Sequence, residues 1–280
     1  MALTEEQIAA LTEKAWEIRR KIIKTIVWAG GGHVGGALSQ VDILVILYYH
    51  YMNIDPQNPK WENRDRLILS KGHGGVGYAP ILADKGYFHE ELLQKFNHTH
   101  SDFAMHLDHL KVPGVDASTG SLGHGLPIAV GLALGAKLKG KKWRTFCILG
   151  DGECNEGSVW EAAMAAKHYN LSNLTAFVDR NQLCIDGSVE NIMALEPFKE
   201  KWMSFGWNTL EIDGHDFQQL GKAIENAHET TEKPTMIIAN TLKGKGVDYM
   251  EGEAPWHYGG LDPEKEEMAL KSIDQLYGKT

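Results

Sequence analysis

Two apolar runs, each ending in a polar cluster, constrain the fold of this chain more than any other feature. The first run, Thr145 to Leu149, stops at Gly150-Asp151-Gly152, and the second, Leu174 to Val178, ends in Asp179-Arg180-Asn181-Gln182. A helix-like segment separates the runs, which predicts two parallel strands joined by a helix. Open α/β sheets bind ligands at the carboxyl ends of their strands, so Asp151 and Asn181 should lie together at such a site.

The residue types in these two clusters suit a metal ion. A carboxylate and an amide oxygen are donors for a hard cation, which usually completes its coordination shell with diphosphate oxygens. Gly-Asp-Gly alone occurs in many turns, but here a strand precedes it, a helix follows it, and Asn181 ends the next strand. The sequence therefore predicts a site that anchors a metal ion and a diphosphate.

The rest of the chain alternates between helical and strand-like patterns. Thr4 and Gln7 form a capping box ahead of a helix. Further elements are expected at Ser39 to Tyr51 (helix), Arg66 to Ser70 (strand), Leu126 to Lys139 (helix), Trp207 to Ile212 (strand), Phe217 to His228 (helix) and Thr235 to Asn240 (strand). This alternation predicts an α/β fold with a doubly wound, mostly parallel sheet and helices on both faces. No linker divides the chain, so residues 1–280 are expected to form one domain.

Composition excludes several functional classes. A net charge of −9 argues against a nucleic-acid or membrane-surface partner, which would favour a basic face. The longest apolar run, Ile43 to Tyr49, is far shorter than the roughly 20 residues that cross a bilayer. The acidic N-terminus does not resemble a signal peptide, and the three cysteines (Cys147, Cys154, Cys184) lack C-x-x-C spacing. A cytoplasmic protein is expected.

Four histidines lie beside glycines or in loops: His33, His73, His106 and His257. Their shared placement favours a functional set over isolated surface residues. A zinc site formed by His98, His100, His106 and His109 is an alternative, although no H-E-x-x-H pattern supports it. The glycine-rich segment Gly31 to Gly36 lacks the preceding strand and the acidic residue of a dinucleotide-binding motif, so nucleotide binding is disfavoured.

Several segments, in order, resemble the thiamine-diphosphate-binding N-terminal part of transketolase, and the match runs nearly end to end. They are Gly30 to Ser39, Asp65 to His73, Pro113 to Gly123, Gly150 to Gly157, Asp179 to Gly187, and Lys243-Gly244-Lys245-Gly246 followed by Trp256-His257.

This resemblance implies a role for each candidate residue. Asp151, the Asn181 side chain and the Leu183 carbonyl would hold a divalent metal, Mg²⁺ or Ca²⁺, which binds the diphosphate of thiamine diphosphate. The remaining implied cofactor contacts are His73, the Gly152 N–H and His257 at the diphosphate, Gly120 and Leu122 at the aminopyrimidine, and Ile185 beneath the bent cofactor. His33, His106 and His257 would line the funnel above it, bind sugar hydroxyls and move protons. Glu156 resembles an interface glutamate, or is simply a carboxylate at a helix N-terminus.

The reaction implied is transfer of a two-carbon ketol unit from a ketose to an aldose, with sugar phosphates as substrates. In this family the cofactor lies between the diphosphate domain of one chain and a pyrimidine domain of another. Because the sequence ends at Thr280, just after the diphosphate domain, we expect a split transketolase. A separate C-terminal subunit would carry the pyrimidine and C-terminal domains, in a heterotetramer with two copies of each subunit.

Three other functions stay open, and three positions depart from the family pattern. The alternatives are another thiamine-diphosphate enzyme (1-deoxyxylulose-5-phosphate synthase-like or 2-oxo acid dehydrogenase α-like), a non-catalytic partner-binding subunit, and, more distantly, a metallohydrolase. His124 replaces the usual glutamine, and Val34 and Leu107 replace prolines that usually follow the His33 and His106 positions.

Overall fold

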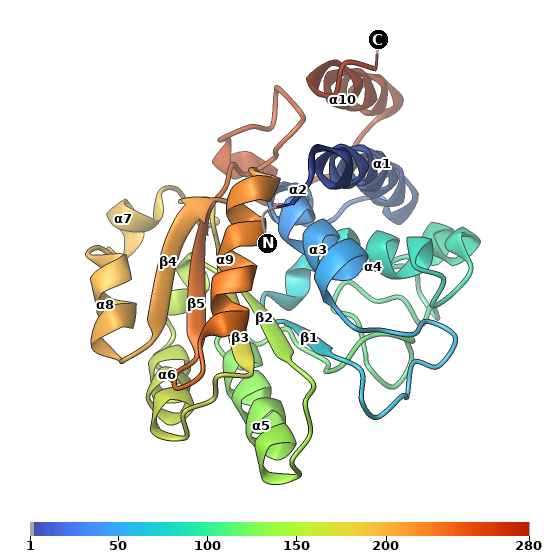
Figure 1. Ribbon diagram of the computed structural model, residues 1–280. Coiled ribbons are helices and arrows are strands. Elements are labelled where there is room, and N and C mark those ends of the chain that lie inside the picture. The colour runs from blue at the N-terminus through green and yellow to red at the C-terminus, as the bar shows by residue number, and fades with distance from the viewer. Residues whose placement is uncertain (1–2, 280) are drawn as a thin grey trace.

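The computed structural model describes residues 3–279 and contains a five-stranded sheet with helices on both faces (Figure 1). Its strands run in the order β1-β2-β3-β5-β4, and every neighbouring pair is parallel. Their bounds are β1 Arg66–Leu69, β2 Thr145–Gly150, β3 Leu174–Arg180, β4 Asn208–Asp213 and β5 Thr235–Asn240. The predicted α/β architecture is confirmed, and each expected strand is present within one or two residues of its expected bounds.

The helices cover the two faces of this sheet. One face packs against α1 (Glu5–Ala29), α2 (Val34–Ser39), α3 (Val41–Ile46), α4 (Gly75–Asp84) and α9 (Phe217–Glu229). The other packs against α5 (Gly125–Leu138), α6 (Gly157–His168) and α8 (Phe198–Ser204). The remaining helical elements are η1 (Leu47–Tyr51), η2 (Gly72–Gly74), η3 (Glu90–Lys95), η4 (Gly152–Asn155), α7 (Val189–Ile192), η5 (Ala254–His257) and α10 (Pro263–Leu276), the last beside α1 (Figure 1).

Strand β2 shows how the sequence supplies both hydrophobic cores. Successive side chains of a strand point to opposite faces of the sheet. Phe146 and Ile148 therefore join the α1 side, whereas Cys147 and Leu149 join the α5 side. All four are fully buried, which explains why β2 is a continuous apolar run rather than an alternating one.

The segment that follows the first helix differs from the expectation. Instead of one helix from Ser39, the chain forms α2 from Val34, then α3, and then a π-helical turn at η1. The glycines indicated a break, yet Gly35 lies inside α2, where a Cβ would come within 2.7 Å of the Trp256 carbonyl oxygen. Glycine serves here to let a buried helix approach another backbone closely.

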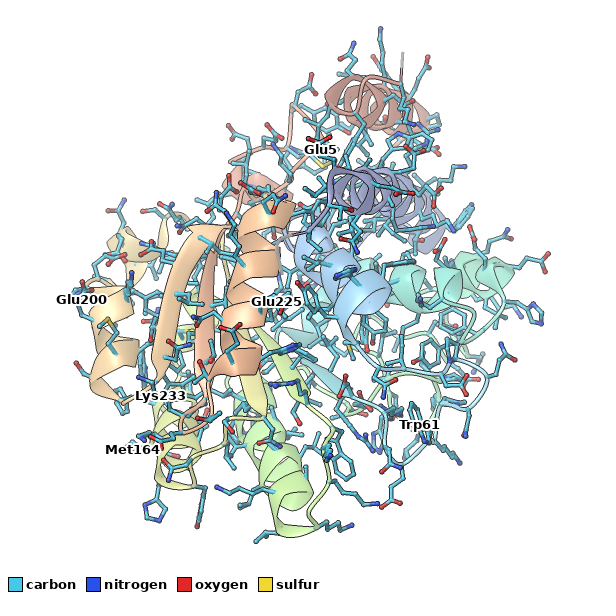
Figure 2. All side chains as sticks on the ribbon, in the orientation of Figure 1. Glu5, Trp61, Met164, Glu200, Glu225 and Lys233 are labelled. Carbon is cyan, nitrogen blue, oxygen red and sulfur yellow. The ribbon has the colours of Figure 1, made fainter. Side chains whose placement is uncertain are left out.

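Capping and surface charge behave as expected. Thr4 and Gln7 form the predicted capping box, and Gly30 ends α1 in a left-handed conformation. Charged side chains cover the outer helix surfaces, as Glu5 on α1 and Glu200 on α8 illustrate (Figure 2). Across residues 3–279, no helix combines the length and apolar character needed to cross a membrane.

Candidate active site at the carboxyl edge of the sheet

A cavity of about 400 Å³ lies where β1, β2, β3 and β5 end. The register places Gly150 of β2 opposite Asp179 of β3, so the residues that follow both strands enter the same space. Eleven of the twelve candidate residues line it: His33, His73, His106, Gly120, Leu122, Asp151, Gly152, Asn181, Leu183, Ile185 and His257. Glu156 is the exception.

Asp151 is a nearly buried carboxylate held by main-chain donors. Its side chain is 3% exposed, and its oxygens accept hydrogen bonds from Gly152 N–H at 2.8 Å and Gln182 N–H at 2.5 Å. Burial raises the pKa of Asp151 to about 6, which means that its negative charge is poorly solvated. A cation beside this carboxylate would stabilise the charged form.

The loop after β3 brings an amide and a main-chain oxygen to the same region. Asn181 Oδ1 accepts a hydrogen bond from Leu183 N–H at 3.2 Å, and the Gln182 amide that donates to Asp151 lies between them in sequence. Cys184 N–H donates to Gly187 O at 2.8 Å and closes the turn. A carboxylate, an amide oxygen and a carbonyl oxygen make a donor set suited to Mg²⁺ or Ca²⁺.

Three histidine rings form a cluster above this loop. The ring centroids of His33 and His73 are 4.9 Å apart, and those of His33 and His257 are 5.2 Å apart. Burial lowers the pKa of His33 to about 4, of His73 to about 2 and of His257 to about 4. All three rings are therefore neutral at pH 7, and each can both donate and accept a hydrogen bond.

One of these rings has an unused polar atom. His33 lines the cavity, and its buried Nδ1 has no hydrogen-bond partner among the described residues. His106 is exposed and packs beside Gly120, where a Cβ would lie 3.1 Å from its ring. A ligand in the cavity could therefore reach both imidazoles.

Two buried lysines that the sequence analysis did not assign also line the cavity. Lys243 donates to Leu183 O at 3.2 Å and lies 3.1 Å from His257 Nδ1. Burial, reinforced by the charge of Lys71, lowers the pKa of Lys243 to about 8. Lys71 donates to Gly36 O at 2.8 Å and pairs with Asp179. Both lysines follow strand ends, at Lys71-Gly72-His73 and Lys243-Gly244-Lys245-Gly246, and this position was the signal that could have identified them.

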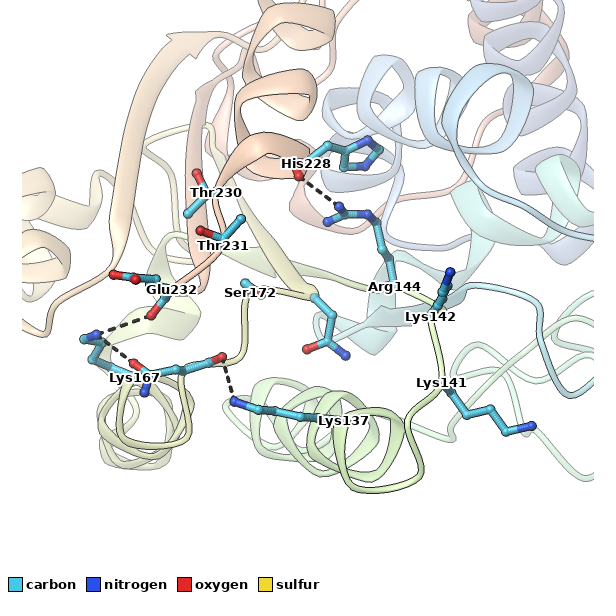
Figure 3. Close-up of a pocket in the computed structure, with 12 residues that line it drawn as sticks. Lys137, Lys141, Lys142, Arg144, Lys167, Ser172, His228, Thr230, Thr231 and Glu232 are labelled. Atoms are coloured by element: carbon cyan, nitrogen blue, oxygen red, sulfur yellow. Dashed lines mark hydrogen bonds between the residues drawn. The ribbon is translucent and has the colours of Figure 1, made fainter.

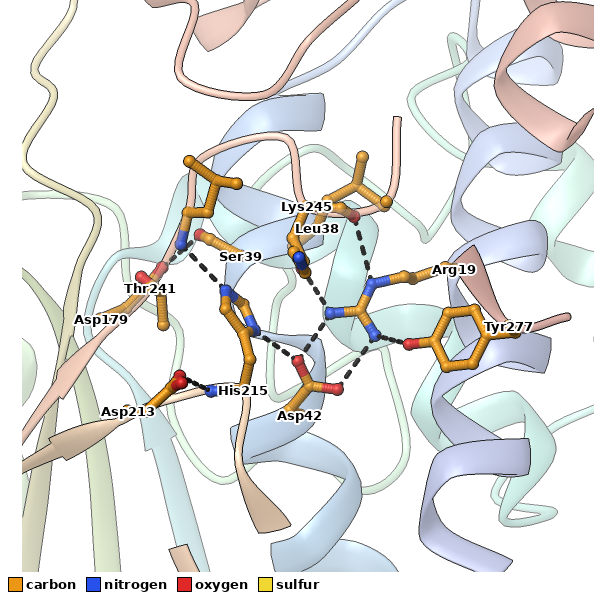
Figure 4. Close-up of polar contacts among 12 residues, drawn as sticks. Arg19, Leu38, Ser39, Asp42, Asp179, Asp213, His215, Thr241, Lys245 and Tyr277 are labelled. Atoms are coloured by element: carbon orange, nitrogen blue, oxygen red, sulfur yellow. Dashed lines mark hydrogen bonds and ion pairs between the residues drawn. The ribbon is translucent and has the colours of Figure 1, made fainter. Parts of the chain in front are cut away.

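A buried polar network fixes the segment that carries Lys243 (Figure 4). His215 Nδ1 lies 2.6 Å from Asp42 Oδ2, and His215 Nε2 accepts a hydrogen bond from Leu242 N–H at 2.9 Å. Arg19 bonds both oxygens of Asp42, at 3.0 and 2.7 Å, and donates to Lys245 O at 3.2 Å. The segment is thus held at two points by side chains from other elements.

The remaining candidates lie at the rim or outside. Ile185 is 66% exposed at the cavity mouth. Glu156 is exposed at the N-cap of α6 and makes no side-chain capping bond, so the structure does not bring it into the cavity. The zinc alternative gains no support, since no group of three His, Cys, Asp or Glu side chains suited to a metal occurs within residues 3–279. Two of its histidines bond elsewhere, His98 to Trp28 O and His109 to Ser118 Oγ.

Comparison with known proteins identifies the family. Residues 12–276 match the family described as transketolase, thiamine diphosphate binding domain. The chain belongs to the transketolase family. It is 42% identical to SqwG, a 6-deoxy-6-sulfo-D-fructose transketolase subunit of Clostridium sp., over 98% of this chain and 99% of that protein. It is 38% identical to one subunit of the apulose-4-phosphate transketolase of Phocaeicola vulgatus, over 98% of this chain and 97% of that protein.

Solved transketolases share the fold. The Campylobacter jejuni enzyme superimposes with a TM-score of 0.89 at 33% identity, over 96% of this chain and 42% of that one. A Pichia stipitis transketolase mutant in complex with fructose 6-phosphate gives 0.89 at 30% identity, over 96% and 40%. The chain therefore spans less than half the length of these solved relatives.

The transketolase cavity fits a metal-bound diphosphate on its own chemistry. A cation would stabilise the charged form of Asp151, while Lys243 offers positive charge to an anion. A Cβ at Gly152 would lie 2.7 Å from Cys184 Sγ, so a larger residue here would require the Cys184 side chain to move. The lining therefore offers groups that suit both the metal ion and the diphosphate.

Proposed function

We propose that this chain is the N-terminal, thiamine-diphosphate-binding subunit of a split transketolase. With a C-terminal subunit it would transfer a two-carbon ketol unit from a ketose to an aldose acceptor. The observation that carries the proposal is the convergence of Asp151, Asn181, Leu183 and the His33–His73–His257 cluster on one cavity. Residues 1–280 act in this proposal as a single diphosphate-binding domain.

Each part of the cavity has a role in holding the cofactor. Asp151, the Asn181 side chain and the Leu183 carbonyl would hold Mg²⁺ or Ca²⁺ against the diphosphate. His73, the Gly152 N–H and His257 would contact the diphosphate, while Gly120, Leu122 and Ile185 would contact its rings. When bound, thiamine diphosphate supplies the electron sink that allows a carbon–carbon bond next to a carbonyl to break.

The histidines would carry out the proton transfers of this reaction. Neutral His33 and His257 can accept a proton from a sugar hydroxyl and return it, because their lowered pKa values keep them uncharged at pH 7. The unpartnered Nδ1 of His33 is available for this task. His106, exposed beside Gly120, would bind a hydroxyl at the entrance.

Exposed apolar side chains support the expectation of a partner protein. Ile185, Ile192 and Met193 are 66%, 47% and 61% exposed on the segment beside the cavity. Apolar groups gathered at a cavity mouth favour a protein interface. A pyrimidine-domain subunit seated there, with two copies of each chain, would complete the paired sites.

The three cysteines are free thiols, in keeping with a reducing cytoplasm. The relatives named above act on 6-deoxy-6-sulfo-D-fructose and apulose 4-phosphate, so both belong in the substrate panel beside fructose 6-phosphate.

Reconstitution tests the proposal. The chain is mixed with a candidate C-terminal subunit, thiamine diphosphate and Mg²⁺, and mass spectrometry follows transfer from each ketose to an aldose phosphate. We expect transfer only when both subunits are present, and we expect Asp151→Ala to abolish it. Asp102→Ala should retain transfer, because Asp102 is an exposed carboxylate that does not line the cavity. Consumption of pyruvate without ketol transfer would instead identify a synthase or dehydrogenase. Failure to bind thiamine diphosphate would identify a non-catalytic subunit.

A further inference from the structure

A second hollow lies at the edge of the sheet opposite the candidate active site (Figure 3). Its volume is about 660 Å³, and an adjoining hollow of about 510 Å³ shares Lys141, Lys142, Arg144 and His228 with it. Arg144 immediately precedes β2, and His228 lies in the last turn of α9. The hollow therefore sits where the strands begin, at the far end of the strand that leads to Asp151.

The lining is strongly basic in a protein whose net charge is −9. Five cations line the larger hollow, namely Lys137, Lys141, Lys142, Arg144 and Lys167, against one carboxylate, Glu232. Some of this charge has local partners. Lys137 donates to Tyr169 O, Lys167 to Glu232 O, and Lys141 pairs with Glu62. Lys137 and Lys167 thus donate hydrogen bonds to main-chain carbonyls near the ends of helices.

Arg144 has one carboxylate nearby, Asp65, which lines the adjoining hollow and opposes the effect of burial on the pKa of Arg144. It forms no ion pair with a carboxylate within the described part of the chain. Its Nη2 donates to His228 O at 3.1 Å, whereas its Nη1 is buried without a hydrogen-bond partner. Burial lowers its pKa, so this guanidinium is incompletely solvated. Leaving a charged donor buried and unpaired costs free energy that an anion would recover.

His228 has a second unpartnered atom, on a ring that packs edge-on against Tyr51. Its Nε2 is buried and has no partner among the described residues. Burial, reinforced by Arg144, lowers the pKa of His228 to about 4, while the Glu225 carboxylate acts in the opposite direction. The ring is neutral at pH 7 and can donate a hydrogen bond from Nε2 to an oxygen ligand.

We propose that this hollow, which we call the basic edge site (Lys142, Arg144 and His228), binds a phosphate-type oxyanion. The guanidinium offers paired donors that match phosphate geometry, His228 adds a neutral donor, and exposed Lys142 adds charge at the rim. The ligand class is a small phosphorylated metabolite or free phosphate. The site is separate from the cofactor cavity, with which it shares no lining residue.

Calorimetry on the full chain tests the site, after thiamine diphosphate and Mg²⁺ have saturated the cofactor cavity. Inorganic phosphate, ribose 5-phosphate and AMP are the probes, and the tightest of them identifies the source of the phosphate group. We expect saturable binding that weakens at least about tenfold in Arg144→Gln and less in Lys142→Gln. Lys24→Gln, an exposed lysine on α1, should bind like the unmodified chain. Binding that neither Arg144→Gln nor Lys142→Gln weakens overturns the proposal, as does an absence of binding.

Arg144→Gln also loses the hydrogen bond to His228 O and could misfold, so a second measurement uses the unmodified chain. The His228 Cε1–H resonance is titrated against pH with and without phosphate in the unmodified chain. Bound anion should raise the pKa of His228, since the charged ring is then stabilised. An unchanged His228 titration in saturating phosphate contradicts the proposal.

Discussion

At the scale of single residues, Asp151 combines burial with negative charge. It is 3% exposed, and it forms no ion pair with a lysine or arginine within residues 3–279. Burial raises its pKa to about 6, so folding gains little from the charged form. This is the expected behaviour of a carboxylate retained for a cation rather than for stability.

Asp151→Asn therefore separates function from stability. We expect affinity for thiamine diphosphate with Mg²⁺ to fall at least about 100-fold, because a charged metal ligand is lost. The melting temperature without cofactor should stay the same or rise, because asparagine removes the buried charge. Calorimetry and thermal unfolding measure the two effects. A loss of affinity below about tenfold would contradict the assigned metal role.

Lys243 makes a second prediction at this scale. Lys243→Met keeps an unbranched side chain but removes the cation that lies beside Leu183 O and His257. We expect affinity for thiamine diphosphate to fall about tenfold or more, since a charge-assisted bond to the diphosphate would be lost. Lys245→Met is the matched control, because Lys245 lies two residues away and pairs with Glu251. Equal effects of both variants would refute a specific role for Lys243.

The sequence predicted Asp151 and Asn181 from position alone, since both follow apolar runs that could only be buried strands. It did not predict Lys243 or Lys71, although both follow strand ends, because lysine is normally a surface residue and this position alone does not show that the side chain turns inward. Glu156 illustrates the converse. It follows Asp151 closely in sequence, yet the start of α6 directs it to the surface.

At the scale of elements, the segment Leu242–Gly246 depends on groups that come from elsewhere in the chain. His215, from the β4–α9 connection, accepts the Leu242 N–H, and Arg19 of α1 donates to Lys245 O. Burial opposes charge on Asp42, but Arg19 outweighs it and keeps the pKa of this carboxyl well below its usual range. Asp42 therefore stays ionised and fixes the His215 ring, leaving Nε2 as the acceptor.

His215→Ala should release this segment. We expect faster hydrogen exchange at the Leu242 amide and several-fold weaker binding of thiamine diphosphate, because Lys243 is no longer held in place. His168→Ala, an exposed histidine on α6, serves as the control. If His215 acts through Lys243, adding Lys243→Met to His215→Ala should cause less than the sum of the two losses. Additive losses would show that His215 acts independently of Lys243.

Element prediction succeeded where burial and local pattern agree, and failed where they conflict. The strands and α9 were placed to within one or two residues. The start of α2 was missed because Gly35 and Gly36 signal a break locally, whereas the packing of Gly35 against Trp256 and Lys243 requires its small size. Such a requirement lies in distant residues and cannot be read from a local window.

At the scale of the whole molecule, the alternation of apolar runs predicted the α/β class but not the sheet order. β5 lies between β3 and β4, so the last strand in the chain is internal. Strand order depends on the path of each crossover connection, and the local sequence pattern does not determine that path. Net charge likewise says little about a local site. A total charge of −9 argues against a nucleic-acid or membrane-surface partner, yet the fold concentrates lysines and Arg144 at one edge.

Buried histidines should make the whole fold sensitive to mild acid. Burial lowers the pKa values of His33, His228 and His257 to about 4 and that of His73 to about 2, against about 6.5 in the unfolded chain. Above about pH 6.5 these rings are neutral in both states. As the pH falls below about 6.5, the unfolded chain binds more protons than the folded one, so the free energy of unfolding decreases.

Asp151 opposes this trend, which makes the prediction testable with one variant. Its raised pKa of about 6 means that the folded chain takes up a proton there before the unfolded chain does. Burial also raises the pKa values of Asp65, Asp116 and Glu153, which act in the same direction as Asp151. We expect the four histidines to outweigh these carboxyls, so the melting temperature of the cofactor-free chain should fall between pH 7 and pH 5. The fall should be steeper in Asp151→Asn and shallower in His228→Gln. Thermal unfolding at half-unit pH steps measures all three slopes, and a melting temperature that stays level or rises toward pH 5 would show that these rings are not buried in the neutral form.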